Sequence, residues 1–419
     1  MHVIEKILAR ASGGGKIECG EIITARIDFA EINDLYLQTL YSFREMGGKR
    51  VWDKERAAFV FDHYAPAPTI QSARIHKEMR EFAREQNLRY HFDINRGVSH
   101  QVLVEAGLVY PGMILAATDS HTTTHGALGA FGTGVGATDM ATILISGELW
   151  FRVPEIIEIR IDGVPPKGVY PKDVILHILG ALKADRAVYK AIDFTGTYVE
   201  GLDVGGRMVL CNMAVEMGAK TAYMRPNQAA LDYVSRRAAR PFEVVTSDPG
   251  YRYAESYVFE IDSLPPQMAL PHSVDTVKPV EELEPEEVHQ GFVGACTGGR
   301  VEDIAEAAAV LRGRKIAPYV RLVVIPASDQ VMKEAMRLGY IQDLMDAGAA
   351  ISTPGCGPCL GAHEGIIAPG EVCVSASNRN FPGRMGSTGG RIYLASPATV
   401  AASVLMGRIT DPRSLVQEQ

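Results

Sequence analysis

Short runs of apolar, mostly β-branched or aromatic residues alternate along the chain with longer stretches of helical periodicity. The predicted elements are strands at 58–61, 90–92, 113–117 and 156–161 and helices at 70–87 and 171–182. The run at 113–117 is apolar throughout, as in a fully buried strand, whereas 156–161 alternates like a half-exposed one. Strands that alternate with helices predict an α/β protein whose sheets are covered on both faces.

The 419 residues allow two to four domains by the usual domain size. Residues 264–287 are rich in proline and glutamate and are the most linker-like part of the chain. We place domain boundaries near Val153 and Val288. The predicted domains are therefore 1–153, 154–287 and 288–419.

Composition narrows the class of protein. The chain has 50 acidic and 42 basic residues, a net charge of −8. This charge argues against nucleic-acid binding, and it would repel an anionic substrate unless arginines gather locally. Six cysteines in a chain of this length indicate reduced thiols of a cytoplasmic protein. We find no signal-peptide pattern, and no apolar run reaches the ~18 residues that cross a membrane.

Two thiols, Cys356 and Cys359, lie in a loop at 352–361 that contains two prolines and three glycines. A third, Cys296, follows the apolar run 291–293 and is also flanked by glycine. Three interpretations fit these thiols: a redox pair, a zinc site with His363 or a distant ligand, and an iron–sulfur cluster on three cysteines with one iron open to substrate. The loops alone leave all three open.

Polar clusters follow several predicted strands, where ligands of α/β sheets bind. Asp62-His63 follows the strand at 58–61, and Asp119-Ser120-His121 follows the strand at 113–117. His100 lies between them in the sequence. An aspartate near a histidine can orient the imidazole for acid–base chemistry, although such residues also serve as helix caps and turns.

Three further motifs are ambiguous by themselves. Gly132-x-Gly134-x-Gly136 lacks the dinucleotide-binding spacing and predicts a glycine-rich loop that enters a helix close to a ligand or another backbone. Asn212 and Glu216 share one face of a predicted helix, which could equally be a solvated face. Residues 377–384 carry Arg379 and Arg384 around a turn, as in an anion site or a surface loop.

Taken together and in this order, the motifs resemble the aconitase superfamily, most closely the large subunits of two-subunit hydro-lyases of the 3-isopropylmalate dehydratase and homoaconitase type. The resemblance covers nearly the whole chain. Its marks are Asp62-His63, His100-Gln101, Tyr110-Pro111-Gly112, residues 118–122, Asn212 to Glu216, Cys296, residues 354–359, residues 378–384 and Ala395-Ser396-Pro397.

The resemblance implies three α/β/α domains around a central cleft that holds a 4Fe–4S cluster on Cys296, Cys356 and Cys359. It implies dehydration and rehydration of a hydroxy-dicarboxylate, with 3-isopropylmalate dehydratase favoured over homoaconitase or a dehydratase of another alkylmalate, such as dimethylmalate. The implied acid–base residues are His63, held by Asp62 and acting as the acid toward the leaving hydroxyl, and two further pairs, Asp119 with His100 and His121 with Glu216. The implied substrate-binding residues are Ser120, Asn212, Asn378, Arg379 and Arg384.

The resemblance also implies a partner. The family's swivelling domain, which carries a catalytic serine, has no counterpart before Gln419, so we expect a separate small subunit that supplies it. The chain departs from the family's pattern at Gly298, where asparagine is usual, and at Asn33-Asp34, which lies near the substrate in relatives. Gly298 is expected to give its loop more backbone freedom.

Two rival interpretations remain. One is a redox protein built on Cys356 and Cys359, which leaves Cys296 unexplained. The other is RNA binding by a cluster-free chain, which the acidic charge disfavours. The remaining cysteines, Cys19, Cys211 and Cys373, are predicted to be buried packing residues.

Overall fold

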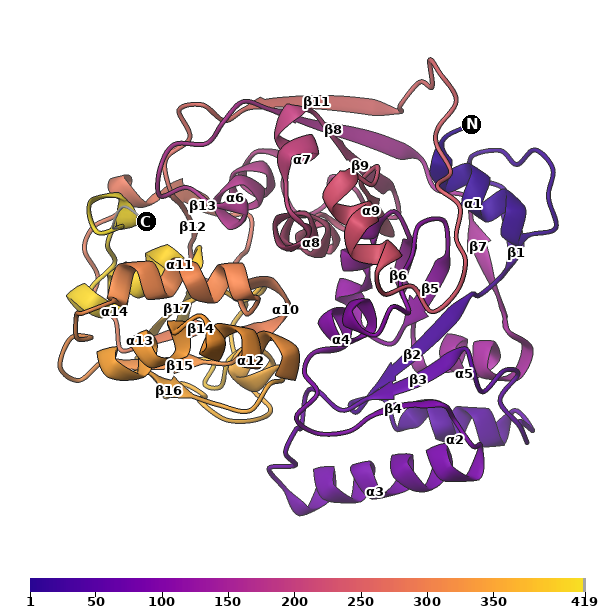
Figure 1. The fold of residues 1–419 in the computed structure, drawn as a ribbon, viewed down its shortest axis with the longest axis horizontal. Helices are drawn as coiled ribbons and strands as arrows, with labels where there is room; N and C mark the ends of the chain where they lie inside the picture. Colours follow the sequence, from indigo (N-terminus) through magenta and orange to yellow (C-terminus); the bar gives the residue numbers. More distant parts are fainter. Residues whose placement is uncertain (417–419) are drawn as a thin grey trace.

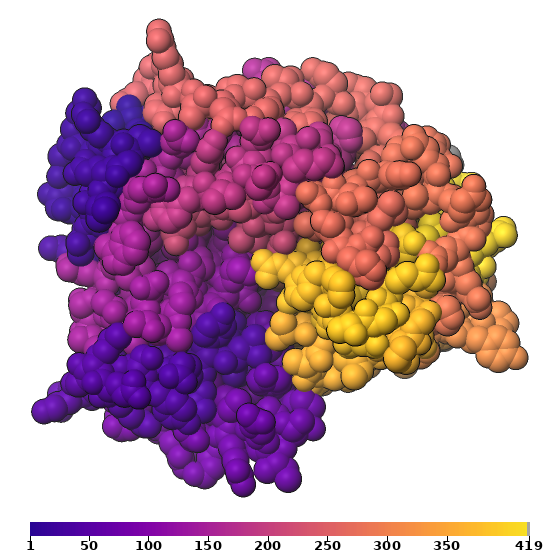
Figure 2. All heavy atoms as spheres, turned by 180° about the vertical axis from the view of Figure 1, so that it is seen from behind, coloured from indigo at the N-terminus to yellow at the C-terminus, as the bar shows by residue number. Residues whose placement is uncertain are grey.

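Three mainly parallel β-sheets organise the computed structural model, which describes residues 1–416. Figure 1 shows the sheets as three lobes around a central region where α4, α8 and α10 lie. Seen from behind in Figure 2, the yellow C-terminal segments lie beside both the magenta and the violet parts of the chain. Residues from all three lobes can therefore reach one central site.

The first sheet has the order β4-β3-β2-β5-β6 and is parallel throughout. Its strands are β2 (Phe29–Asn33), β3 (Ala57–Val60), β4 (Tyr90–Phe92), β5 (Ile114–Ala117) and β6 (Phe131–Gly134). Its helices are α2 (Gln38–Glu45), α3 (Ile70–Glu85), α4 (Ser99–Glu105), the 3₁₀ helix η1 (Ser120–Leu128) and α5 (Ala137–Ser146). Beside it lie α1 (Val3–Ala11) and an antiparallel pair, β1 (Ile22–Arg26) with β7 (Glu148–Arg152).

The second sheet has the order β10-β9-β8-β11 and is also parallel. Its strands are β8 (Ile156–Asp162), β9 (Ala191–Thr195), β10 (Thr221–Tyr223) and β11 (Glu255–Glu260). Its helices are α6 (Pro171–Leu182), α7 (Thr197–Gly201), α8 (Val204–Met213), η2 (Ala214–Met217) and α9 (Gln228–Ser235). The end of α8 and the η2 turn carry Asn212 and Glu216 toward the centre.

The third sheet has the order β13-β12-β18-β17-β14-β15-β16. Its strands are β12 (Gln267–Ala269), β13 (Val277–Pro279), β14 (Gln290–Val293), β15 (Arg321–Val324), β16 (Ala350–Ile351), β17 (Val372–Ser375) and β18 (Arg391–Leu394). Its helices are η3 (Val280–Glu282), α10 (Ala295–Gly298), α11 (Val301–Leu311), α12 (Asp329–Arg337), α13 (Tyr340–Ala347), η4 (Gly357–Leu360), α14 (Pro397–Met406) and η5 (Pro412–Ser414). Strands β14 to β18 pair in parallel, and β12 joins them antiparallel.

The sequence periodicity predicts these helices and strands because each of them buries its apolar side. In α3, Thr69 caps the first turn by accepting a hydrogen bond from the Ser72 amide. The inner face of the helix packs on β3, where Phe82 stacks on Phe59 with ring centroids 5.9 Å apart. All four predicted strands and both predicted helices are confirmed within a few residues at their ends.

Two predictions about irregular segments are corrected. The stretch 264–287 is not a free linker, because β12 and β13 within it belong to the third sheet. The glycine-rich segment begins as a strand, β6, before it enters α5. A Cβ on Gly132 would lie 2.3 Å from the Thr122 carbonyl oxygen, so glycine allows β6 to approach the η1 turn closely. The two predicted domain boundaries stay a prediction.

Candidate metal centre and acid–base groups

The three cysteines singled out in the sequence come together at the carboxyl ends of strands in the third sheet. Cys296 lies in α10 directly after β14, whereas Cys356 immediately precedes the η4 turn and Cys359 lies within it. The amide of Asn378, which follows β17, lies between two of the sulfurs: its Nδ2 is 3.4 Å from Cys296 Sγ, and its Oδ1 is 3.6 Å from Cys359 Sγ. All three thiols are buried and free of disulfides.

Local backbone geometry fixes the Cys356–Cys359 loop. Gly357 has φ +57°, and a Cβ at this position would lie 2.1 Å from Ile325 Cδ1, so only glycine fits. The Cys356 amide donates a 2.7 Å hydrogen bond to the Asp62 carbonyl oxygen. The cysteine loop of the third sheet is thus anchored to a strand end of the first.

The spacing of the thiols argues against a single zinc ion. Three sulfurs on one tetrahedral zinc lie about 3.8 Å apart, given Zn–S bonds of about 2.3 Å. Within residues 1–416, the compact group of three candidate ligand atoms, all within 4.8 Å of one another, consists of Asp34, Asp62 and His63 and contains no cysteine. His363, the suggested fourth zinc ligand, instead hydrogen-bonds the Pro66 carbonyl oxygen at 2.7 Å.

Side chains donate hydrogen bonds to two of the three sulfurs, as at sites of thiolate-bound metal groups. In the absence of a metal, burial raises the pKa of Cys296 to about 12. Asn212 Nδ2 donates to Cys296 Sγ at 3.1 Å, and Arg384 Nη2 donates to Cys359 Sγ at 3.7 Å. The hydrogen bond from the Cys356 thiol, helped by Arg384, lowers the pKa of Cys359 well below its usual range although burial opposes this. Hydrogen bonds to ligating sulfurs tune iron–sulfur clusters. The donor set therefore fits such a cluster.

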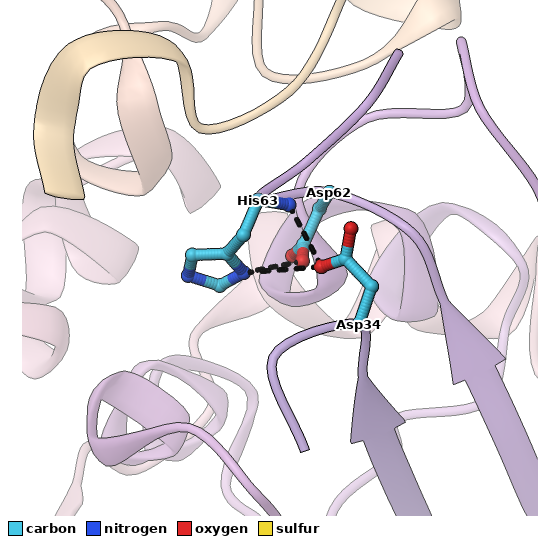
Figure 3. Close-up of side chains that lie close together, drawn as sticks. All are labelled: Asp34, Asp62 and His63. Atoms are coloured by element: carbon cyan, nitrogen blue, oxygen red, sulfur yellow. Dashed lines mark hydrogen bonds and ion pairs between the residues drawn. The ribbon is translucent and has the colours of Figure 1, made fainter. Parts of the chain in front are cut away.

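Near the cysteines, His63 lies against several carboxylates, of which Figure 3 shows Asp62 and Asp34. Its Nδ1 lies 2.6 Å from Asp62 Oδ1 and 3.7 Å from Asp34 Oδ1, and its Nε2 lies 3.7 Å from Asp119 Oδ2. Burial alone would lower the pKa of His63, but these three carboxylates outweigh it and raise the pKa to about 10. At neutral pH His63 therefore carries a proton that it can give to a leaving group.

Asp34 holds this arrangement in place. Its oxygens accept hydrogen bonds from the amides of His63 (3.0 Å) and Tyr64 (2.8 Å) and from Nε2 of His76 (2.9 Å). A carboxylate so fully engaged positions its neighbours and has little capacity left for a metal ion. Sequence reasoning noted Asp34 as a departure from the family's pattern and missed this role, because His76 comes from the middle of α3.

A second pair of acid–base contacts centres on Asp119. Its Oδ1 accepts the His121 amide at 2.7 Å, which caps η1, and lies 3.0 Å from His100 Nε2. Asp119 is therefore both the helix cap and the predicted acid–base partner of His100. Burial would raise the pKa of Asp119, but His100 and His121 lower it well below its ordinary value.

His121 in turn connects to the second sheet. Its Nε2 lies 2.8 Å from Glu216 Oε1, which also accepts a 2.8 Å hydrogen bond from Arg379 Nε. Asn212 and Glu216 are both largely buried, so the solvated-face interpretation of this helix is wrong. Ser120 Oγ lies 3.4 Å from His121 Nδ1. The structure thus brings all the predicted site residues together, with Asn378 and Arg384 directed at the sulfurs.

The burial predicted for the three remaining cysteines is partly confirmed. Cys211 and Cys373 are buried as predicted, but Cys19 is exposed in the loop before β1, which corrects its prediction.

Glu31 was missed: it lies at the centre of β2, fully buried, with no hydrogen-bond partner for either carboxylate oxygen. Burial and the neighbouring Asp62 raise the pKa of Glu31 well above its usual value. The sequence signal that could have identified Glu31 is a charged residue inside a mostly apolar strand.

Gly298 is not a loosening element, contrary to expectation. A Cβ there would lie 2.4 Å from the Ala376 Cβ and 2.8 Å from its carbonyl oxygen. Gly298→Ala should therefore force apart the Cys296 and Asn378 loops and lower the free energy of unfolding by about 1–3 kcal/mol, as overpacking does. Chemical denaturation measures this. Gly313→Ala, in open space but at a positive φ, is a control for backbone strain alone, and equal effects would contradict the packing argument.

Comparison with known proteins agrees with this geometry. Residues 45–407 match the model of the aconitase family (aconitate hydratase). A probable 3-isopropylmalate dehydratase large subunit of Methanothermobacter thermautotrophicus is 49% identical over 99% of both chains. A probable methanogen homoaconitase large subunit of the same organism is 48% identical over 99% of this chain and 98% of the relative.

The fold agrees as well. The crystal structure of Thermococcus kodakaraensis aconitase X aligns with 90% of this chain and 89% of that one, with a TM-score of 0.51 at 13% identity. The chain belongs to the aconitase family. Within that family it is a hydro-lyase of the large-subunit type, and family membership implies an iron–sulfur cluster. Among residues 1–416 no helix combines the length and apolarity needed to cross a membrane.

Proposed function

We propose that this chain is the cluster-bearing large subunit of 3-isopropylmalate dehydratase, which converts 2-isopropylmalate into 3-isopropylmalate by removing and returning water. One observation carries the proposal: the Asn378 amide, hydrogen-bonded at its two ends to the sulfurs of Cys296 and Cys359, lies beside the histidine–carboxylate pairs. Metal ligands and acid–base groups for one elimination thus meet at one place.

The proposed cofactor is a 4Fe–4S cluster held by Cys296, Cys356 and Cys359. When bound, it supplies a Lewis-acidic iron without a protein ligand, which favours departure of a hydroxyl group. Three thiolates for four metal positions leave that iron open. Anaerobic reconstitution followed by iron and sulfide analysis should give about four of each per chain, whereas zinc without visible absorption would refute the assignment.

The chain's own residues would share the proton chemistry. His63, protonated at neutral pH, donates its proton to the leaving hydroxyl. Asp119 with His100 and Glu216 with His121 hold the other protons near the reacting carbons. Arg379 donates a hydrogen bond from its Nε to Glu216, and the rest of its guanidinium would bind a substrate carboxylate. In a chain of net charge −8, such local arginines are needed to attract a diacid.

Relatives of this chain carry the printed description of large subunit, which supports a separate small subunit as partner. We propose that this partner supplies the swivelling domain and the serine base that forms the carbanion. Co-purification with candidate small subunits from the same genome tests this. Activity of the isolated chain alone would refute it.

Homoaconitase is the second candidate function, because the two relatives from Methanothermobacter thermautotrophicus differ by a single percentage point in identity to this chain. Steady-state assays of the reconstituted two-subunit enzyme with isopropylmalate, homocitrate and dimethylmalate decide between them. We expect the largest kcat/KM for isopropylmalate. A larger value for the tricarboxylate would overturn this choice of substrate and leave the class of reaction unchanged.

A further inference from the structure

Lys172, at the start of α6, is a buried cation that the proposed chemistry does not use. It is 2% exposed, although lysine is rarely buried. Its ammonium donates hydrogen bonds to the carbonyl oxygens of Ala376 (2.9 Å) and Ser377 (2.5 Å). The side chain of Lys172, from a helix beside the second sheet, thus forms hydrogen bonds to the main chain of the third sheet.

Lys172 binds the main chain at Ala376 and Ser377, which directly follow β17 and lead to Asn378 and Arg379. Thr297, next to Cys296, donates its hydroxyl to the same Ala376 carbonyl oxygen at 3.1 Å. Lys172 and Thr297 therefore fix the same peptide from two directions. The orientation of the Asn378 amide toward the two sulfurs depends on this peptide.

The charge of Lys172 is not met by a hydrogen-bonded carboxylate. Among the described residues, its ammonium donates to the carbonyl oxygens of Ala376 and Ser377. The nearby Asp173 is occupied by the amides of Tyr170 and Gln267, and burial raises its pKa to about 7. Asp303, Cys296 and Cys359 are the charges that most support the ammonium against burial. Asp303 is thus its first negative counterpart, and the cysteine site comes next.

We propose that Lys172 is a positioning residue of the metal centre: its ammonium clamps the peptide that orients Asn378 and places a positive charge beside the ligating thiolates. The inference rests on the proposed cluster. It adds a residue from the second sheet to a centre whose ligands all come from the third. Two effects follow, a mechanical one on cluster retention and an electrostatic one on cluster potential.

The test compares Lys172→Met, Lys172→Arg and Thr297→Val in the full chain after anaerobic reconstitution. Lys172→Met should shorten the lifetime of the cluster toward a chelator at least about tenfold, as loss of outer contacts to metal ligands does. It should also make the reduction potential more negative, because a positive charge that favours the added electron is gone. Lys172→Arg should retain the wild-type potential. Thr297→Val should shorten the lifetime without shifting the potential.

Lys183→Met is the matched control, since Lys183 follows the other end of α6 and also donates to a carbonyl, that of Asp275 at 3.0 Å. It should leave lifetime and potential unchanged. A Lys172→Met chain with wild-type lifetime and potential would overturn the inference. If that variant does not fold, an unchanged cluster lifetime in Thr297→Val overturns the clamp. A wild-type chain that takes up no cluster would instead refute the proposed function.

Discussion

Cys296→Ser should abolish the dehydratase activity of the reconstituted enzyme, with kcat/KM lowered at least about a thousandfold. A Lewis-acidic metal contributes several kcal/mol to stabilising such a transition state, and each 1.36 kcal/mol is a factor of ten. The variant should also bind less iron and lose visible absorption. Cys296 is 7% exposed and packs with Val98 and Ala327, so the isosteric change should leave the fold intact.

The matched control is Cys19→Ser, which changes an exposed thiol in the loop before β1. It should leave iron content and activity unchanged. The same pair of variants separates the proposed enzyme from the redox interpretation, because a Cys356–Cys359 dithiol would function without Cys296. Full disulfide exchange activity in Cys296→Ser, with no iron in the wild type, would establish the redox protein instead.

His63→Gln should lower kcat by about 10²- to 10⁴-fold, the usual contribution of a positioned general acid. Glutamine keeps the size and polarity of the side chain but carries no transferable proton at neutral pH. KM should change little if His63 acts mainly on the leaving hydroxyl. His177→Gln, a change in α6 beside Phe259, is the control and should leave kcat unchanged. A kcat within a factor of three of wild type would exclude His63 as the acid.

The pH profile gives an independent test of the same residue. Carboxylates hold the pKa of His63 at about 10, above its ordinary 6.5, so the acid stays protonated well into alkaline solution. Asp62→Asn removes the nearest negative charge and should move the alkaline limb of kcat to lower pH. The sign for stability is the same: pairing of charged His63 stabilises the fold fully below pH 6.5, and this contribution disappears as the pH rises through about 10. An unmoved alkaline limb would mean that another group limits the rate.

The sequence predicts the elements of this molecule well because strands and helices follow local periodicity. It also predicts the residues of the site, since motifs such as Cys356-Gly357-Pro358-Cys359 keep their order in the chain. The family resemblance implied the pairs Asp119–His100 and His121–Glu216, and both contacts are present. Other contacts between motifs could not be predicted. Nothing in the sequence pairs Arg379 with Glu216 or directs Asn378 at two sulfurs, because these partners come from different sheets.

The errors have physical causes of the same kind. Gly298 was expected to loosen its loop, yet it is needed because Ala376 from another segment fills the space of a side chain. Asp34 was noted only for its place near the substrate in relatives. The sequence did not show that its carboxylate receives donors from His76 and from the backbone at His63 and Tyr64. The proline-rich stretch before β14 resembled a linker because strands as short as β12 and β13 have no strong pattern.

The hydrogen bond from the Cys356 amide to the Asp62 carbonyl oxygen needs neither metal nor side chain. It holds the Cys356–Cys359 turn against Asp62, the residue before His63, without a bound cluster. If the proposed cluster were lost, this main-chain hydrogen bond would still hold the turn that carries two of its three cysteines. We therefore expect iron and sulfide to be taken up again without refolding of the polypeptide.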